Sequence, residues 1–220
     1  MGTIPTVSTE IRTFGDLLNR LGGVSPTRIR MRPLPGRATA RDVLRVHARE
    51  DRLCELVDRT LVEKAMGYSE STLAGAILSM LRAFVMPRKL GLVSGESGMM
   101  KLFPNLVRIP DVAYASWHRF ANRRVPKEPI PDLVPDLVVE VLSAGNTKQE
   151  MARKRREYFS AGVVLVWEVD PEKRTVTVYT SPTESKVLKE SKILSGEPAL
   201  PGFRIRLKEL FAELDLPGRD

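Results

Sequence analysis

The chain has 220 residues with 35 Lys and Arg, 27 Asp and Glu, and a net charge of +8, which suits one domain and favours a polyanionic partner. One cysteine and two histidines exclude an internal disulfide and argue against a zinc site built from Cys or His. No apolar run reaches the length of a membrane span and residues 1–20 lack a signal-peptide pattern, so we expect a cytoplasmic protein without membrane contacts. Any metal would have oxygen ligands, which favours Mg²⁺ or Mn²⁺, and no small-molecule organic cofactor is expected.

Residues 1–39 are polar and rich in proline, and they predict a partly extended N-terminal arm with one short helix over about 14–21. The main domain is expected over 40–211, with a C-terminal tail at 212–220. It begins with a helix over about 40–49. Two short strands, 53–57 and 60–64, then flank a tight turn at Asp58-Arg59.

The clearest helix is expected over 69–86, where an apolar stripe recurs with helical spacing. Ser69 or Ser71 can cap its start, and Pro87 ends it. Four strands are predicted next, at 90–94, 99–103, 105–109 and 112–115. Residues 117–135 form a basic, proline-rich loop of a length that is usually functional.

A strand over 137–142 follows, then a turn, and then a helix over 147–161 capped by Asn146 or Thr147. Alternating residues predict a hairpin of two strands, 163–169 and 175–180. A short strand at 203–207 and a helical turn near Leu210 end the domain. The pattern predicts an α/β (mixed α+β) fold in which one helix precedes a mixed sheet and one crosses it.

A glutamate interrupts what otherwise reads as a buried strand. Glu140 lies within Leu137-Val138-Val139-Glu140-Val141-Leu142. An unpaired buried carboxylate is very costly, so we expect a compensating charge from a metal ion or a lysine. The competing interpretation places the strand at the sheet edge, with Glu140 facing water.

Asp111 is a second candidate acid, at the start of another predicted strand. It lies 29 positions before Glu140, which allows the two to sit on adjacent strands with the basic loop between them. Two carboxylates on adjacent strands repel each other unless a cation or a proton lies between them. The alternative is an ordinary loop acid after a proline, because Asp132 and Asp136 also follow prolines.

The helix after Glu140 offers two cations for this site. Helical periodicity places Arg155 near the middle of the inward stripe and Lys154 on its flank, so either can reach the strand or extend to solvent. Glu55, in Leu53-Cys54-Glu55-Leu56-Val57, could add a third carboxylate, although the pattern alone favours a surface acid.

Basic residues gather in three stretches, at 28–37, 119–127 and 148–156. Each can be a solvated surface or a nucleic-acid contact, and their proximity to the candidate acids favours nucleic acid. Trp117, Phe120 and Trp167 could stack on bases, although core packing is favoured for Trp167.

Several ordered motifs over about residues 40–211 together resemble the Uma2 family, which belongs to the PD-(D/E)XK, restriction-endonuclease-like superfamily. The motifs are Cys54-Glu55-Leu56-Val57-Asp58, Leu61-Val62-Glu63, Pro110-Asp111-Val112, Pro135 to Ser143, Lys154-x-x-x-Tyr158, Ala161-Gly162-Val163 and Val166 to Pro171. The resemblance implies a restriction-endonuclease-like core, a mixed sheet flanked by helices, and a Mg²⁺-dependent or Mn²⁺-dependent DNA endonuclease.

The resemblance also assigns roles. Asp111 and Glu140 would bind the metal with the carbonyl of Val141, Lys154 would be the catalytic lysine, and Glu55 would orient Lys154 or bind a second ion. The residues expected to contact nucleic acid are Arg119, Arg123, Arg124, Lys127 and Arg155. Superfamily members often act as dimers, so a homodimer is a further expectation.

Two positions depart from the pattern. The wider superfamily has its lysine two residues after the second acid, where this chain has Leu142, whereas Lys154 matches the place that the lysine has in Uma2-like sequences. Arg59 replaces a glycine that is frequent in the family, which affects the turn rather than the chemistry. The departure at Leu142 motivates an alternative, a nucleic-acid-binding protein that keeps the fold without turnover.

Overall fold

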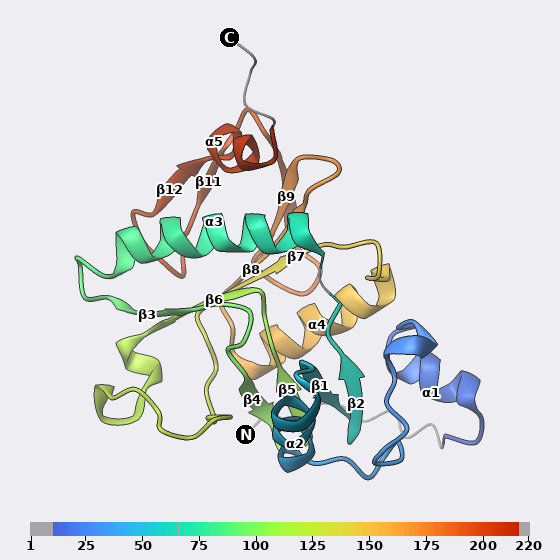
Figure 1. Ribbon diagram of the computed structural model, residues 1–220. Helices are drawn as coiled ribbons and strands as arrows, with labels where there is room; N and C mark the ends of the chain where they lie inside the picture. Colours follow the sequence, from blue (N-terminus) through green and yellow to red (C-terminus); the bar gives the residue numbers. More distant parts are fainter. Residues whose placement is uncertain (1–10, 66, 216–220) are drawn as a thin grey trace.

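The computed structural model describes residues 11–65 and 67–215 (Figure 1). Residues 1–10 of the predicted arm and 216–220 of the predicted tail lie outside the described residues. Within the described part, the strands form one six-stranded, one four-stranded and one two-stranded sheet. None of the described helices is long and apolar enough to cross a membrane.

The six-stranded sheet has the order β10-β9-β8-β7-β6-β3. Its strands are β3 (Gly91–Ser94), β6 (Val112–Ser116), β7 (Leu137–Val141), β8 (Leu165–Asp170), β9 (Thr175–Tyr179) and β10 (Ser185–Lys189). β7 and β8 are parallel and are joined by α4 (Lys148–Ala161), whereas the other neighbours are antiparallel. β7 therefore lies inside the sheet, where all five of its residues are buried.

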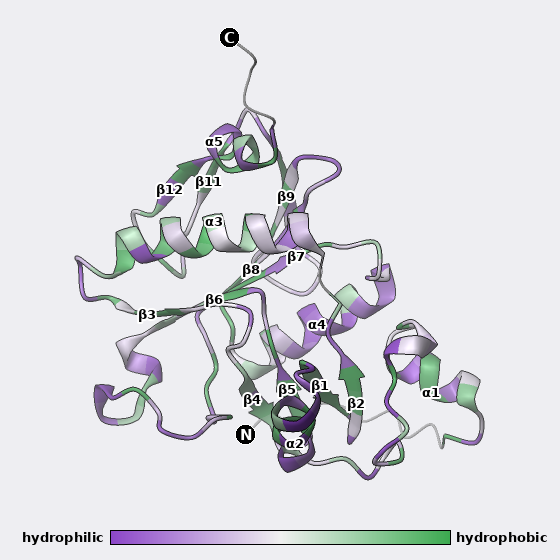
Figure 2. Cartoon of the chain, in the orientation of Figure 1, coloured by the Kyte–Doolittle hydropathy of each residue, from purple (hydrophilic) through white to green (hydrophobic). Residues whose placement is uncertain are grey.

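The two faces of this sheet are covered by helices of different character. Leu137, Val139 and Val141 pack with α3 (Tyr68–Val85) and α5 (Leu207–Phe211) in one apolar cluster. Val138 packs on the other side with Tyr158 of α4. Figure 2 shows α4 as largely hydrophilic, although Glu150, Lys154 and Glu157 of this helix are buried. The face toward α4 therefore holds buried charge.

The four-stranded sheet has the order β2-β1-β5-β4 and lies on the α4 side of the molecule, together with α2 (Figure 1). Its elements are α2 (Ala40–Glu50), β1 (Cys54–Val57), β2 (Thr60–Glu63), β4 (Met100–Phe103) and β5 (Leu106–Arg108). The two-stranded sheet pairs β11 (Ile193–Ser195) with β12 (Arg204–Arg206). Short 3-10 turns complete the fold at Pro26–Arg28, Trp117–Arg119, Ala121–Arg123 and Ala212–Leu214.

The N-terminal segment packs on the domain. α1 (Phe14–Arg20) starts with a capping box in which Thr13 accepts from the amide of Asp16, and Leu17 and Leu21 are buried in the cluster that includes Tyr158. Arg28 donates two hydrogen bonds of 2.9 Å to Glu150 and one of 2.8 Å to the carbonyl of Glu63. This segment is therefore tied to both α4 and β2.

The predicted elements are confirmed within about two residues at most ends, with three corrections. The single predicted sheet is wrong, because the early hairpin belongs to a separate sheet, and β10 and β11 were not predicted. β10 was missed because four of its five residues are exposed and no apolar alternation marks it. The cap of α3 by Ser69 or Ser71 is also wrong, since Gly67 holds the N-cap position without a side-chain bond.

Replacing Arg28 by Met should lower the free energy of unfolding by about 3–5 kcal/mol, because it leaves the buried charge of Glu150 unpaired. The matched control is Arg20→Met, whose pair with Asp58 is 36% exposed on both sides and should change stability by less than about 1 kcal/mol. Urea denaturation measures both. Equal, small effects would show that Arg28 is not needed to hold the N-terminal segment.

Candidate active site

Glu140 faces α4 because side chains alternate along β7, so that it shares a side with Val138. Lys154 of α4 donates a 3.0 Å hydrogen bond to its Oε2, and the hydroxyl of Tyr158 donates a 2.5 Å bond to its Oε1. The predicted compensating charge beside Glu140 is thus supplied by a lysine. The interpretation of an edge strand with Glu140 facing water is wrong, because β7 lies between β6 and β8.

Asp111 lies directly before β6, beside Glu140, as expected from adjacent strands. Its amide donates to the carbonyl of Val139 at 3.2 Å, and its Oδ2 accepts a 2.6 Å bond from the amide of Val141. Lys64, which follows β2, places its Nζ 2.7 Å from Oδ1. The interpretation of Asp111 as an ordinary loop acid is therefore wrong: it is a buried carboxylate with a buried ammonium beside it.

Glu55 of β1 completes the acidic group. Its pattern favoured a surface acid, and this expectation is wrong, because the residue is 1% exposed. Its Oε2 accepts a 2.6 Å bond from Arg108, its Oε1 accepts from the amide of Ile109 at 3.1 Å, and Lys154 Nζ lies 3.5 Å from Oε1. Alternation along a four-residue strand could not reveal this, because both faces of β1 are covered.

Neighbouring buried carboxylates share the cations that neutralise them. Arg108 bridges Glu55 and Glu157, and Arg153 also binds Glu157 at 2.7 Å. Burial raises the pKa of Glu55, but the charges of Lys154 and Arg108 outweigh this effect and lower the pKa to about 2. Glu55 is thus held ionised by the cations that surround it.

Glu140 behaves in the opposite way. Burial raises its pKa, the charges of Asp111 and Glu55 raise it further, and Lys154 and Lys64 offset only part of this. The pKa of Tyr158 also lies well above its usual value, because of burial and the neighbouring charge of Glu140. The raised pKa of Glu140 therefore follows mainly from burial, with a contribution from the two neighbouring carboxylates.

The donor set suits a hard divalent cation. Asp111 and Glu140 supply carboxylate oxygens, and the adjacent backbone supplies carbonyl oxygens, the ligands that Mg²⁺ and Mn²⁺ prefer. Within residues 11–65 and 67–215, however, no three His, Cys, Asp or Glu side chains are grouped as a metal site. Each carboxylate oxygen of Asp111 and Glu140 already accepts one hydrogen bond or ion pair, so a cation there would bind oxygens that are each engaged on one side.

The tie between Lys154 and Arg155 is resolved by the register of the sheet. Glu140 and Glu168 are partners across the parallel pair of β7 and β8. Lys154 binds Glu140, whereas Arg155 binds Glu168 at 2.6 Å and stacks on Tyr179 at 4.3 Å from the ring centroid. Each glutamate therefore has its own cation from α4, and only Lys154 belongs to the cluster around Asp111.

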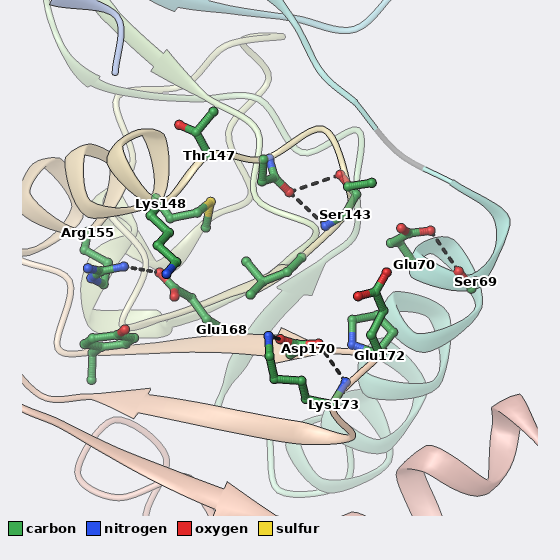
Figure 3. Close-up of a pocket in the computed structure, with 16 residues that line it drawn as sticks. Ser69, Glu70, Ser143, Thr147, Lys148, Arg155, Glu168, Asp170, Glu172 and Lys173 are labelled. Atoms are coloured by element: carbon green, nitrogen blue, oxygen red, sulfur yellow. Dashed lines mark hydrogen bonds and ion pairs between the residues drawn. The ribbon is translucent and has the colours of Figure 1, made fainter. Parts of the chain in front are cut away.

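One cavity lies beside Arg155 and Glu168, and a second is lined by Asp111 of the cluster. The larger, of about 530 Å³, is drawn in Figure 3: Ser143, Lys148 and Glu172 line it, and Arg155 reaches Glu168 at one side. The other, of about 350 Å³, lies between α3 and the loop at 95–98, and Asp111 lines it. Asp111 is thus the member of the cluster that a ligand in this second cavity would meet.

The predicted nucleic-acid contacts in the loop at 117–135 lie away from the acids, whereas Arg155 lies on α4 next to Lys154. Residues 117–135 connect the end of β6 to the start of β7, whereas Asp111 and Glu140 lie at the opposite ends of these strands. One strand length of five residues separates them, about 15 Å. Of the predicted cations in this loop, Arg119 binds Asp136 at 2.7 Å, whereas Arg123, Arg124 and Lys127 are exposed.

Sequence reasoning did not single out four residues of this network: Lys64, Arg108, Tyr158 as a hydrogen-bond donor, and Glu157. Lys64 directly follows β2 and Arg108 ends β5, and the end of a short strand is an ordinary place for a surface cation. Their burial follows from the approach of the two sheets, which no local pattern reports. Trp167, by contrast, lies in the apolar core, as predicted.

Comparison with known proteins identifies the family and the fold. The model of the Uma2 family, described as "Putative restriction endonuclease", matches residues 40–208. The crystal structure of a "putative nuclease" from Anabaena variabilis ATCC 29413 is similar, with a TM-score of 0.66, 20% identity, and coverage of 74% of this chain and 92% of that one. This likeness confirms the predicted fold class. No functionally curated protein matches the chain.

Replacing Glu55 by Gln should make stability less dependent on pH. Because the pKa of Glu55 is lowered in the folded protein, its ionised form stabilises the fold at pH values above 4.5, the ordinary pKa of a glutamate. This contribution is lost as the pH falls toward 2. The difference in unfolding free energy between wild type and Glu55→Gln should shrink by about 2 kcal/mol between about pH 6 and pH 3. A difference that stays constant in urea titrations over this range would contradict the role of Glu55.

Proposed function

Because the chain belongs to the Uma2 family, we propose that it is a divalent-metal-dependent endonuclease that hydrolyses phosphodiester bonds of DNA. The observation that carries this proposal is the pair of buried carboxylates, Asp111 and Glu140, next to the buried ammonium of Lys154. Two acids and a lysine around one point form the minimal set for metal-assisted phosphodiester hydrolysis.

Asp111 and Glu140 would hold the metal, and the carbonyl of Val141 is the third proposed ligand, since the amide of Val141 already binds Asp111. A bound divalent ion would supply Lewis-acid activation of water and of the phosphate. The other contributions come from the protein. Glu55 and Glu140 hold the ammonium of Lys154 between them, so that its position is fixed before substrate arrives.

Lys154 would position the attacking water and offset the charge that develops on the phosphate. The same carboxylates keep it protonated, because although burial lowers the pKa of Lys154, Glu140 and Glu55 raise it above its usual value. Lys154 would therefore act as a hydrogen-bond donor and a fixed positive charge rather than as a base. Tyr158 restrains the second oxygen of Glu140.

DNA would approach Asp111 from the cavity between α3 and the loop at 95–98. Arg123, Arg124 and Lys127 would bind phosphates about four base pairs from the cleaved bond, given a spacing of about 15 Å and a rise of about 3.4 Å per base pair. Arg119 and Arg155 would have to leave their carboxylate partners to do so. These contacts neutralise backbone and carry no sequence information.

Asp111→Asn and Glu140→Gln should each abolish Mn²⁺ binding in calorimetric titration and lower the DNA cleavage rate by about 10²–10³-fold or more, since each removes a proposed metal ligand. Lys154→Met should lower cleavage similarly while retaining Mn²⁺ binding. The matched control is Asp132→Asn, an acid that also follows a proline but is 77% exposed and should leave both measurements unchanged.

The non-catalytic alternative gives a different pattern in the same experiment. A protein that only binds DNA would cleave no form of it with Mg²⁺ or Mn²⁺, and its binding would be indifferent to divalent metal and to Asp111→Asn. That result would overturn the nuclease proposal.

The triple variant Arg123→Ala/Arg124→Ala/Lys127→Ala should weaken DNA binding and reduce its dependence on salt. Each lost phosphate contact lowers the slope of log K against log salt by about 0.9. Fluorescence anisotropy over a series of salt concentrations measures this slope. Lys186→Ala, an exposed lysine on β10, is the control. An unchanged slope in the triple variant would place the DNA elsewhere.

A further inference from the structure

Lys64 is a buried lysine to which the sequence and the family assign no role. Its side chain is 5% exposed, and its Nζ lies 2.7 Å from Asp111 Oδ1 and 2.7 Å from the carbonyl oxygen of Ile109. A lysine buried to this extent is rare without a specific partner, and here the partner is the proposed metal ligand itself.

The oxygens around this ammonium resemble the ligands of a metal ion. A carboxylate and a main-chain carbonyl, two residues apart, converge on one cation, and these are the oxygen types that Mg²⁺ and Mn²⁺ prefer. The other oxygen of Asp111 accepts from the amide of Val141, a backbone group fixed within the sheet. A cation that took Oδ1 of Asp111 and the carbonyl oxygen of Ile109 as ligands would therefore occupy the position of the Lys64 ammonium.

The charge balance points the same way. The carboxylates of the central cluster are Glu55, Asp111 and Glu140, and their nearest cations are Lys64, Lys154 and Arg108. Since Arg108 is shared with Glu157, the cluster has no positive charge in excess. Loss of Lys64 leaves a buried carboxylate uncompensated, whereas a divalent ion added beside Lys64 places like charges together. The Lys64 ammonium and a divalent ion are thus alternative occupants of the position beside Asp111.

We propose that the Lys64 ammonium occupies the cation position of Asp111 in the metal-free protein and must be displaced when a divalent cation binds, so that Lys64 sets the affinity of the site for metal. This inference rests on the proposed metal dependence. The displacement is feasible because Lys64 directly follows β2 and has a flexible four-carbon side chain, and because Asp111 borders an open cavity. Lys154, which is held between two glutamates, stays in place.

Calorimetric titration of Mn²⁺ into wild type and Lys64→Met tests this inference. Removal of one charged hydrogen bond from the competing side should tighten Mn²⁺ binding by about ten-fold or more. Lys64→Arg keeps the charge and should stay within a few-fold of wild type. Lys101→Met removes a half-buried lysine from the pair with exposed Asp132 and should leave Mn²⁺ affinity unchanged. Equal Mn²⁺ affinity in wild type and Lys64→Met would overturn the inference and leave the nuclease proposal intact, whereas loss of binding in every protein would overturn both.

A second measurement on wild type needs no variant. Reductive methylation followed by mass spectrometry should leave Lys64 unmodified in the metal-free protein, where its side chain is buried, and should modify it at saturating Mn²⁺. Lys154 should stay protected in both states. Protection of Lys64 that is unchanged while Mn²⁺ is bound would show that the ammonium is not displaced.

Discussion

The ammonium of Lys154 is the charge on which the rest of this structure depends. It lies 3.0 Å from Glu140 in the six-stranded sheet and 3.5 Å from Glu55 in the four-stranded sheet, while its own helix packs between them. Without it, two sheets would meet through buried carboxylates that repel each other. The interface between the sheets is therefore held by a buried ionic network, with Arg108 and Lys64 extending it on either side.

Such a network is a weak source of stability, because the desolvation of buried ions offsets much of their attraction. An apolar core could also hold the sheets together, but it could not bind a cation or a phosphate, as our proposal requires of this site. Burial, together with the charges of Asp111 and Glu55, raises the pKa of Glu140. In our proposal a divalent cation binds beside Asp111, and the Lys64 ammonium holds that position in its absence.

The geometry also separates the proposed chemistry from the proposed DNA contacts. β6 and β7 are antiparallel, so the acids lie at one end of this strand pair and the basic loop at the other. Exposed Arg123, Arg124 and Lys127 are free of the constraints that hold the buried cluster, and their side chains remain available to phosphates. The N-terminal segment has the opposite character: Arg28 is bound to Glu150 and stabilises the start of α4, rather than extending toward a partner.

The sequence by itself determined the strand that carries Glu140, the position of Asp111 beside it, most helices and strands, and the family, because hydrophobic periodicity and ordered motifs are local properties. Helical spacing did not decide between Lys154 and Arg155, and the resemblance to the family favoured Lys154. The structure shows how the two differ, because each meets a different glutamate across β7 and β8. The sequence favoured the surface for Glu55 and gave no signal for Lys64. Their burial was decided only by the tertiary structure, because a residue at a short strand is buried or exposed according to the sheet that packs against it, and that sheet comes from a distant part of the chain.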